Sequence, residues 1–125
     1  MSGKRYFLDT NAIVSLLRGD ARIALKLSDA EWIGISIISV IEYLSYNKLE
    51  EADKYLMNSF MEKVDVINLE MSNDRLIDTA VSVRKKGRIK LPDAIIVACA
   101  LLHNAIFVTA DKELFKIEGL SLLRI

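Results

Sequence analysis

The segment from Tyr6 to Asn11 constrains the fold more than any other part of the sequence. An apolar, strand-like stretch runs into a lone acid, Asp9, and two small polar residues follow before a helical pattern begins. This order is typical of a buried strand that ends at the rim of a sheet. Because ligands of open α/β sheets bind at the carboxyl ends of the strands, Asp9 is a candidate functional residue.

Strand-like and helical patterns alternate along the rest of the chain. Strands are predicted at 5–9, 32–37, 64–69, 106–109 and 120–124, and helices at 10–18, 20–29, 36–46, 49–62, 72–86, 92–103 and, as a short turn, 112–115. Gly19 and Gly87 are expected to end two of these helices. Strands separated by helices require right-handed crossovers, so we predict one α/β domain spanning 1–125. Its sheet should be mainly parallel, with about five strands and helices on both faces.

Three later acids have equally apolar surroundings. Glu42 is the only formal charge from 33 to 47, Asp93 is the only one from 91 to 102, and Asp111 follows the apolar stretch at 105–108 closely. Asp9, Asp93 and Asp111 have an ordinary alternative role as helix caps, which Asp fills well, whereas Glu42 lies too far into its helix for that role. An isolated buried charge is costly, so we predict that the four carboxylates converge on one divalent cation, Mg²⁺ or Mn²⁺.

Composition narrows the chemistry further. The chain has one cysteine, Cys99, and one histidine, His103, which argues against a zinc cluster and against a Ser–His–Asp triad. Its isolated glycines do not form a phosphate-binding loop. The 17 basic and 17 acidic residues balance, which argues against a whole-surface grip on nucleic acid. An acidic metal site activates water beside a phosphodiester, so the predicted reaction is phosphodiester hydrolysis.

Targeting and membrane signals are not found in the sequence. Lys4 and Arg5 precede only a short apolar strand, which is not the pattern of a signal peptide. Uncharged runs are shorter than the 18 or so apolar residues that a membrane helix needs. We therefore expect a cytoplasmic protein with no membrane contact.

Four short motifs together resemble those of PIN domains, and within that superfamily the VapC-type ribonuclease toxins of prokaryotic toxin–antitoxin operons. They are Leu8-Asp9-Thr10-Asn11, Ser39-Val40-Ile41-Glu42-Tyr43, Leu91-Pro92-Asp93-Ala94 and Val108-Thr109-Ala110-Asp111. The resemblance implies a three-layer α/β/α fold, a homodimer and a cognate antitoxin that inhibits it. It also implies an endoribonuclease that depends on Mg²⁺ or Mn²⁺, with the catalytic and metal-binding quartet Asp9, Glu42, Asp93 and Asp111. A housekeeping RNA-processing nuclease of the same fold fits equally well.

The resemblance extends to neighbouring residues. Asn11 and Thr109 match small polar positions near the metal. Many relatives carry a further Asp two residues after the last acid, directly followed by Phe. Here that position is Glu113, and Leu114 separates it from Phe115, so the chain departs from the pattern for a fifth acid.

A basic cluster precedes Asp93: Arg84, Lys85, Lys86, Arg88 and Lys90. Cations at a helix C-terminus are the ordinary explanation for part of it. The alternative is contact with the RNA backbone beside the cut site, for which Arg84, Arg88 and Lys90 are the candidates. By family analogy, the region of the helix pair 21–30 and 49–62 is a candidate groove for an antitoxin helix or strand, with the apolar residues Leu25, Leu27, Trp32, Tyr55, Leu56, Met57, Phe60 and Met61.

Three other functions compete with a nuclease. A receiver-type signalling domain also places acids and Mg²⁺ at strand ends, but it needs a pair of acids near the first strand. A phosphatase with an aspartate nucleophile needs a second acid where this chain has Asn11. A catalytically silent binding module of the same fold would not need the full quartet.

Overall fold

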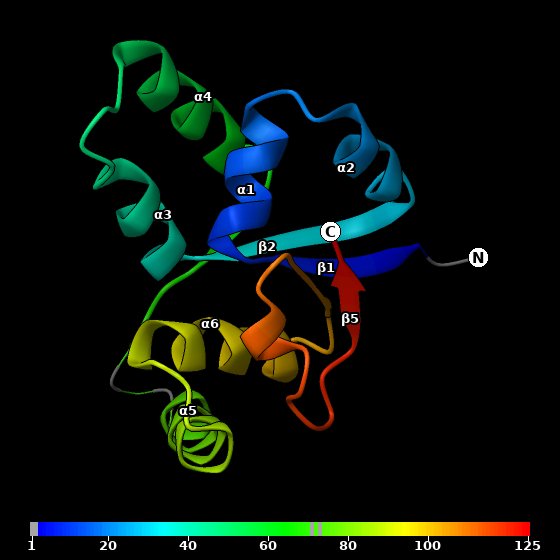
Figure 1. The fold of residues 1–125 in the computed structure, drawn as a ribbon, viewed down its shortest axis with the longest axis vertical. Helices are drawn as coiled ribbons and strands as arrows, with labels where there is room; N and C mark the ends of the chain where they lie inside the picture. Colours follow the sequence, from blue (N-terminus) through cyan, green and yellow to red (C-terminus); the bar gives the residue numbers. More distant parts are fainter. Residues whose placement is uncertain (1–2, 71, 73) are drawn as a thin grey trace.

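The computed structural model describes residues 3–70, 72 and 74–125 and has three layers, with helices on both faces of a sheet (Figure 1). The sheet strands are β1 (Lys4–Leu8), β2 (Ala30–Ser36), β3 (Asp65–Ile67), β4 (Ile106–Thr109) and β5 (Leu122–Arg124). They pair in the order β3-β2-β1-β4-β5, and every pair is parallel. The predicted five-stranded parallel α/β fold is confirmed.

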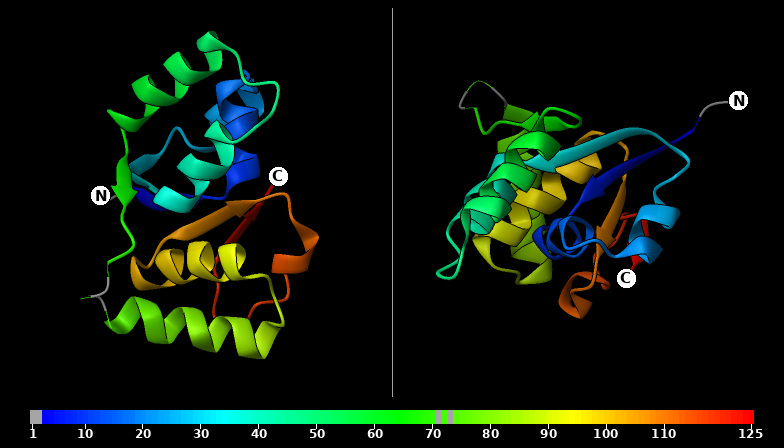
Figure 2. Two further views of the ribbon diagram at one scale, coloured as in Figure 1. Left: turned by 90° about the vertical axis from the view of Figure 1, so that its left-hand side faces the viewer. Right: turned by 90° about the horizontal axis from the view of Figure 1, so that it is seen from above.

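The helices divide between the two faces of the sheet (Figures 1 and 2). One face carries α1 (Thr10–Leu17), α2 (Ala21–Lys26), α3 (Ile37–Leu44) and α4 (Glu51–Met61), and the other carries α5 (Asp74–Gly87) and α6 (Leu91–Leu102). A short 3-10 helix, η1 (Lys112–Leu114), connects β4 to β5. None of the helices within the described residues has the length and apolar character needed to span a membrane.

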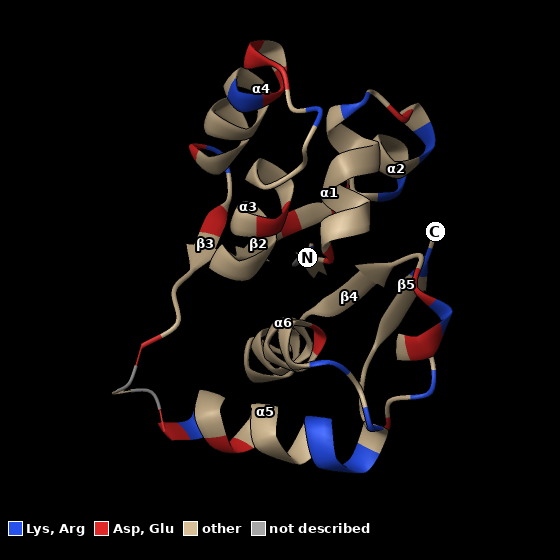
Figure 3. Ribbon diagram, turned by 60° about the vertical axis from the view of Figure 1, so that its left-hand side comes forward, with Lys and Arg blue, Asp and Glu red and all other residues tan. Residues whose placement is uncertain are grey.

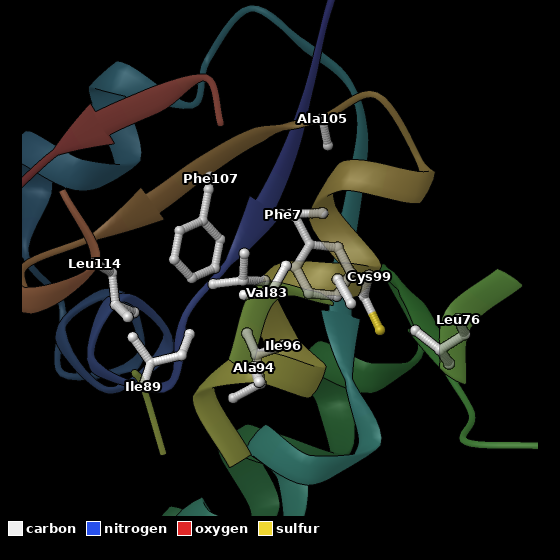
Figure 4. Close-up of a cluster of buried hydrophobic side chains, with 13 residues drawn as sticks. Phe7, Leu76, Val83, Ile89, Ala94, Ile96, Cys99, Ala105, Phe107 and Leu114 are labelled. Carbon is white, nitrogen blue, oxygen red and sulfur yellow. The ribbon is translucent and has the colours of Figure 1, made fainter. Parts of the chain in front are cut away.

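The central strand β1 supplies side chains to both faces, because successive residues of a strand point to opposite sides. Tyr6 and Leu8 pack in the apolar cluster under α1–α4, whereas Phe7 belongs to the cluster under α5 and α6 (Figure 4). All three side chains are buried. The strand that delivers Asp9 is therefore anchored on two sides.

Several element boundaries differ from the sequence prediction. The second helix ends at Lys26 rather than near residue 29, and β3 has only three residues. Ser36 caps α3 by accepting a hydrogen bond from the Ile38 amide, so the helix proper begins at Ile37. Gly87 is the last residue of α5, and the left-handed backbone that ends the helix is at Arg88, with φ 53°.

The order of the strands in the sheet determines where the candidate residues lie. The chain proceeds from β1 outward to β2 and β3 and then returns to the other side of β1 with β4 and β5. The two directions of winding separate between β1 and β4, and such a switch point opens a crevice at the carboxyl ends of the strands. Asp9 follows β1 and Thr109 ends β4, so both lie at this position.

Candidate active site

Asp9 lies at the centre of the site and is only 4% exposed. Its main-chain amide donates to the carbonyl of Val108 at 3.0 Å, which continues the β1–β4 pairing by one residue. Its carboxylate accepts from the Thr10 amide at 2.8 Å and thereby caps α1. The capping role and the candidate functional role therefore coincide at this residue.

Thr109 and Asn11 hold the other oxygen of the Asp9 carboxylate. Thr109 Oγ1 donates to Asp9 Oδ2 at 2.6 Å, and Asn11 Nδ2 donates to the same oxygen at 3.0 Å. Asn11 Oδ1 accepts from the Ala110 amide at 2.9 Å, and Thr109 Oγ1 accepts from the Asp111 amide at 3.0 Å. The two polar residues that sequence comparison singled out thus fix Asp9 relative to the turn that carries Asp111.

Glu42 reaches the site from α3. Although its side chain is exposed, its Oε1 accepts a 2.6 Å hydrogen bond from the Thr10 hydroxyl. The Thr10 hydroxyl also lies 2.9 Å from the hydroxyl of Ser39. Thr10 and Ser39 were part of the motifs quoted above but had been assigned no role there, because their pairing requires α1 and α3 to be adjacent.

Asp93 and Asp111 complete the set. Asp93 is half-buried in the first turn of α6, whose N-cap position is taken by Lys90, so Asp93 is not the cap that its sequence position allowed. Asp111 does cap a helix, since its Oδ1 accepts from the Glu113 amide at 3.0 Å at the start of η1.

The four carboxylates influence one another electrostatically. Burial raises the pKa of Asp9 above its usual range and outweighs the hydrogen bonds from Thr109 and Thr10, which lower it. The negative charges of Asp111 and Glu42 make smaller contributions that also raise the pKa. Burial also raises the pKa of Asp93 to about 6, helped by the negative charges of Asp9, Asp111 and Glu42, whereas Lys90 opposes the rise. The charges of Asp9, Glu42 and Asp111 therefore act on Asp93, and the convergence of the four acids on one cation stays a prediction.

The donor set suits a hard divalent cation, although the side chains are not closed around one position. Within the described ranges, none of the four acids forms an ion pair with a basic side chain. No group of three His, Cys, Asp or Glu side chains in the described part of the chain is arranged to hold a metal ion. Oxygen donors that lack a positive partner fit an ion such as Mg²⁺, which is commonly held by one or two carboxylates and several waters.

Other residues singled out in the sequence lie around this centre. Glu113, at the position of the fifth acid in relatives, is exposed and lies 3.5 Å from the ammonium of Lys116. Arg84 and Arg88 line an apolar groove of about 590 Å³ between α5 and α6, and both side chains are exposed. Among the basic cluster, Lys90 is the residue whose charge acts on Asp93.

The segments expected to form a partner groove are only partly exposed. Leu27 and Met57 are buried core residues, and Trp32 packs with the cluster on the opposite face of the sheet. Leu25 and Tyr55 are indeed exposed, by 73% and 71%. A groove of about 240 Å³ instead lies among α1, α3 and α4 and includes Glu42 in its wall.

Comparison with known proteins gives one family and several similar structures. A model of the PIN domain family matches residues 6–120. The structure of VapBC2 from Rickettsia felis bound to a DNA fragment from their promoter contains a similar chain, 21% identical, with 96% of this chain and 98% of that chain covered and a TM-score of 0.80. A toxin–antitoxin complex from Klebsiella pneumoniae matches at 25% identity, with 96% and 99% covered and a TM-score of 0.79. VapBC-1 from nontypeable Haemophilus influenzae matches at 25% identity, with 96% and 97% covered and a TM-score of 0.73. No match was found among curated proteins.

The raised pKa of Asp93 predicts that the protein in chelator loses stability as the pH rises. The pKa of Asp93 is 3.8 in the unfolded chain and about 6 in the folded protein. The folded state therefore loses stability relative to the unfolded state as the pH rises between these two values, and the loss is complete above about pH 6. We expect Asp93→Asn to raise the Tm by about 3–6 °C at about pH 7.5 and by clearly less at about pH 4.5, measured by thermal unfolding.

Asp20→Asn is the matched control for this experiment. Asp20 caps α2, and its hydrogen bonds with Arg22 lower the pKa of its carboxyl group. The ionised form of Asp20 therefore stabilises the folded state, so Asp20→Asn should not raise the Tm at neutral pH. An equal rise in Tm at both pH values for Asp93→Asn would contradict the electrostatic explanation.

Proposed function

The chain belongs to the PIN domain family, and on that premise we propose that it is a metal-dependent endoribonuclease. We further propose that it is the VapC-type toxin of a type II toxin–antitoxin pair, acting in the cytoplasm. The similar chains from toxin–antitoxin complexes support this assignment over nearly the whole length of the chain.

One observation carries the nuclease proposal. Four carboxylates from four separate elements act on one another electrostatically at the switch point of the sheet, and no basic side chain among the described residues pairs with them. Such an arrangement repels a polyanion unless cations are present, so binding and cleavage of RNA should require a divalent metal. The acids Asp9, Glu42, Asp93 and Asp111 would hold Mg²⁺ or Mn²⁺ together with water.

The bound ion would lower the pKa of a water molecule and offset negative charge on the phosphodiester. The contribution of the protein's own side chains is to hold the acids in fixed positions. Thr109 and Asn11 keep both the Asp9 carboxylate and the turn before Asp111 in place, so two acids hold a fixed relation before any ligand arrives. Preorganised charge of this kind is the main contribution that proteins make to phosphoryl chemistry.

RNA contact is proposed for the residues between α5 and α6. Lys90 is the cation that acts on Asp93, and Arg88 lies two residues before it on an exposed turn. Basic side chains beside the acids would hold phosphates that flank the cut position. Arg84 lies one turn further back on α5, and we place it in a protein contact instead, as argued below.

The competing functions fit the geometry less well. Both carboxylate oxygens of Asp9 are occupied by hydrogen bonds and the side chain is nearly fully buried, which disfavours Asp9 as a nucleophile for a receiver domain or a phosphatase. Asn11, at the position where a phosphatase needs its second acid, uses both ends of its amide to hold Asp9 and Ala110. A catalytically silent binding module would not need four acids that lack basic partners.

A cognate antitoxin is the first partner that we propose. The groove of about 240 Å³ among α1, α3 and α4 is lined by apolar and aromatic side chains, by Arg18 and Asp53, and by Glu42 of the candidate active site. Tyr46, one of the lining residues, is exposed, and the same helices carry the exposed apolar residues Ile41 on α3 and Tyr55 on α4. An amphipathic segment seated there would lie beside the acids and so would obstruct the substrate.

A second copy of the chain is the other proposed partner, and we place it on α5. Acidic residues lie toward the N-terminal end of this helix and basic residues gather at its C-terminal end (Figure 3). An outward stripe along this helix begins with acids, continues with apolar residues and ends with bases: Asp74, Ile77, Asp78, Val81, Arg84 and Lys85. A two-fold axis at Val81 places Asp78 of each copy opposite Arg84 of the other, with the exposed apolar residues between them. Arg75 follows Asp74 in the sequence but lies outside this stripe on the helix, so it serves as a control position.

The nuclease proposal predicts metal-dependent cleavage of a pool of structured RNAs. Mg²⁺ or Mn²⁺ should support cutting, chelator should abolish it, and Asp9→Asn and Asp93→Asn should each lower the rate by at least about 100-fold. Asp20→Asn, which keeps its capping ability at the far end of α1, should cut like the wild type. Residual cutting that is equal in all variants would identify a contaminant, and the absence of cutting with any metal would favour the binding module.

The proposed RNA contacts predict a change in salt dependence. In an Asp9→Asn background, which allows binding without cutting, Arg88→Gln with Lys90→Gln should weaken RNA binding. The slope of log Kd against log salt should flatten by about 1.4, because each lost phosphate contact to single-stranded RNA is worth about 0.7. Lys26→Gln with Lys63→Gln removes the same charge elsewhere and is the control; an equal loss of slope there would point to net charge rather than to these contacts.

The α5 surface predicts a charge-swap result. Arg84→Glu places like charges opposite each other and should raise the dimer dissociation constant about tenfold or more, as measured by analytical ultracentrifugation without RNA. Asp78→Lys added to Arg84→Glu restores opposite charges and should restore association. Arg75→Glu, outside the stripe, should have a small effect. A failure of the double variant to recover would exclude the antiparallel pairing.

A further inference from the structure

Two hydroxyl groups connect α1 and α3 beside the candidate active site. Ser39 Oγ lies 2.9 Å from Thr10 Oγ1, which in turn lies 2.6 Å from Glu42 Oε1. An ionised carboxylate only accepts hydrogen bonds, so the single hydroxyl proton of Thr10 is donated to Glu42. The Thr10 oxygen is then left to accept the proton of Ser39. The chain of donors therefore runs in one direction, from Ser39 through Thr10 to Glu42.

Helix capping does not account for these hydroxyls. The first turn of α1 is capped by Asp9, and that of α3 is capped by Ser36, which accepts from the Ile38 amide. Ser39 is the third residue of α3 and its side chain is 0% exposed. Serine is a weak helix former, and burying its hydroxyl is unfavourable unless the group finds a partner.

We propose that Ser39 and Thr10 form a hydroxyl relay that positions Glu42 toward the other three acids. Both are positioning residues in this role, because they act on a bound ion or substrate only through Glu42. The inference rests on the proposed function for the identity of the ion, but the hydrogen-bonded relay itself does not depend on it.

Glu42 needs such support more than the other acids do. Its side chain is long and exposed, whereas Asp9 and Asp111 are short and are fixed by main-chain amides. An unsupported Glu samples several rotamers, and holding one of them costs conformational entropy each time a ligand binds. A relay anchored on a buried serine removes part of that cost before binding. The orientation of Glu42 is then coupled to the packing of α1 against α3.

The test compares Thr10→Val, which keeps the shape but lacks the hydroxyl, with Thr10→Ser, which retains the hydroxyl. Ser39→Ala removes the first donor. Two measurements are made on each protein: the Mn²⁺ dissociation constant from the free-ion electron paramagnetic resonance signal, and the position of Glu42 in crystal structures. Thr79→Val, on α5, is a matched control for loss of a threonine hydroxyl, and circular dichroism melting confirms that each variant folds.

Thr10→Val should weaken Mn²⁺ binding by about 10-fold to 100-fold, the usual effect of removing a group that orients a metal ligand. Ser39→Ala should weaken it by a smaller factor, and Thr10→Ser should recover most of the loss. Because Thr10 acts only through Glu42, Thr10→Val combined with Glu42→Gln should bind no more weakly than Glu42→Gln alone. In the Thr10→Val crystal, Glu42 should leave its wild-type position.

Two results would overturn the relay: additive losses in the double variant, or a Glu42 side chain that keeps its place in Thr10→Val. Failure of the wild type to bind Mn²⁺ is a different result and counts against the proposed metal-dependent function. The crystal structure of Thr10→Val still decides the relay in that case, since the position of Glu42 is observed without metal.

Discussion

The buried carboxylate of Asp9 is the constraint on which the rest of the site depends. Removing a charge from water is costly unless hydrogen bonds or nearby charges compensate. Here the compensation comes from donors at the start of α1 and at the end of β4. Thr109 can donate to Asp9 only because β4 lies directly beside β1 in register. The crossover that places β4 there therefore also assembles the first part of the site, and the apolar anchoring of β1 on both faces keeps it rigid.

Neutral groups, rather than cations, hold the acids in place. Thr10, Asn11 and Thr109 donate hydrogen bonds to Asp9 or Glu42, and none of them cancels a carboxylate charge. A lysine or arginine in the same position would stabilise the empty site by an ion pair and would take the place of a metal. This arrangement leaves negative charge uncompensated, which costs stability in the absence of a ligand and would favour binding of the proposed divalent cation. The raised pKa of Asp93 has burial as its main cause, and the negative charges of Asp9, Asp111 and Glu42 add to it.

The order of helices and strands, and the places of the acids along them, could be predicted from the sequence. The contacts between elements far apart in the chain could not. Lone acids after apolar strands are local patterns, so Asp9 and Asp111 could be located, and their capping bonds are local as well. The link from Thr10 to Ser39 spans 29 residues and exists only because α1 packs beside α3. Trp32 was included in the candidate partner groove, but it packs with the cluster under α5 and α6. Its strand has apolar residues on both sides, so alternation gave no direction. Lys90, rather than Asp93, occupies the cap position of α6 because Pro92 fits within the first helical turn.

Arg88 takes a left-handed backbone conformation in the turn between α5 and α6, with φ 53°. A left-handed conformation is easy for glycine and costs energy for other residues, and Gly87 lies immediately before it. The glycine nevertheless remains the last residue of the helix, and the strained position is taken by an exposed arginine. A glycine at position 88 would relieve this strain. Strained backbone is concentrated at functional positions, which agrees with the RNA contact proposed for the exposed Arg88 two residues before Lys90.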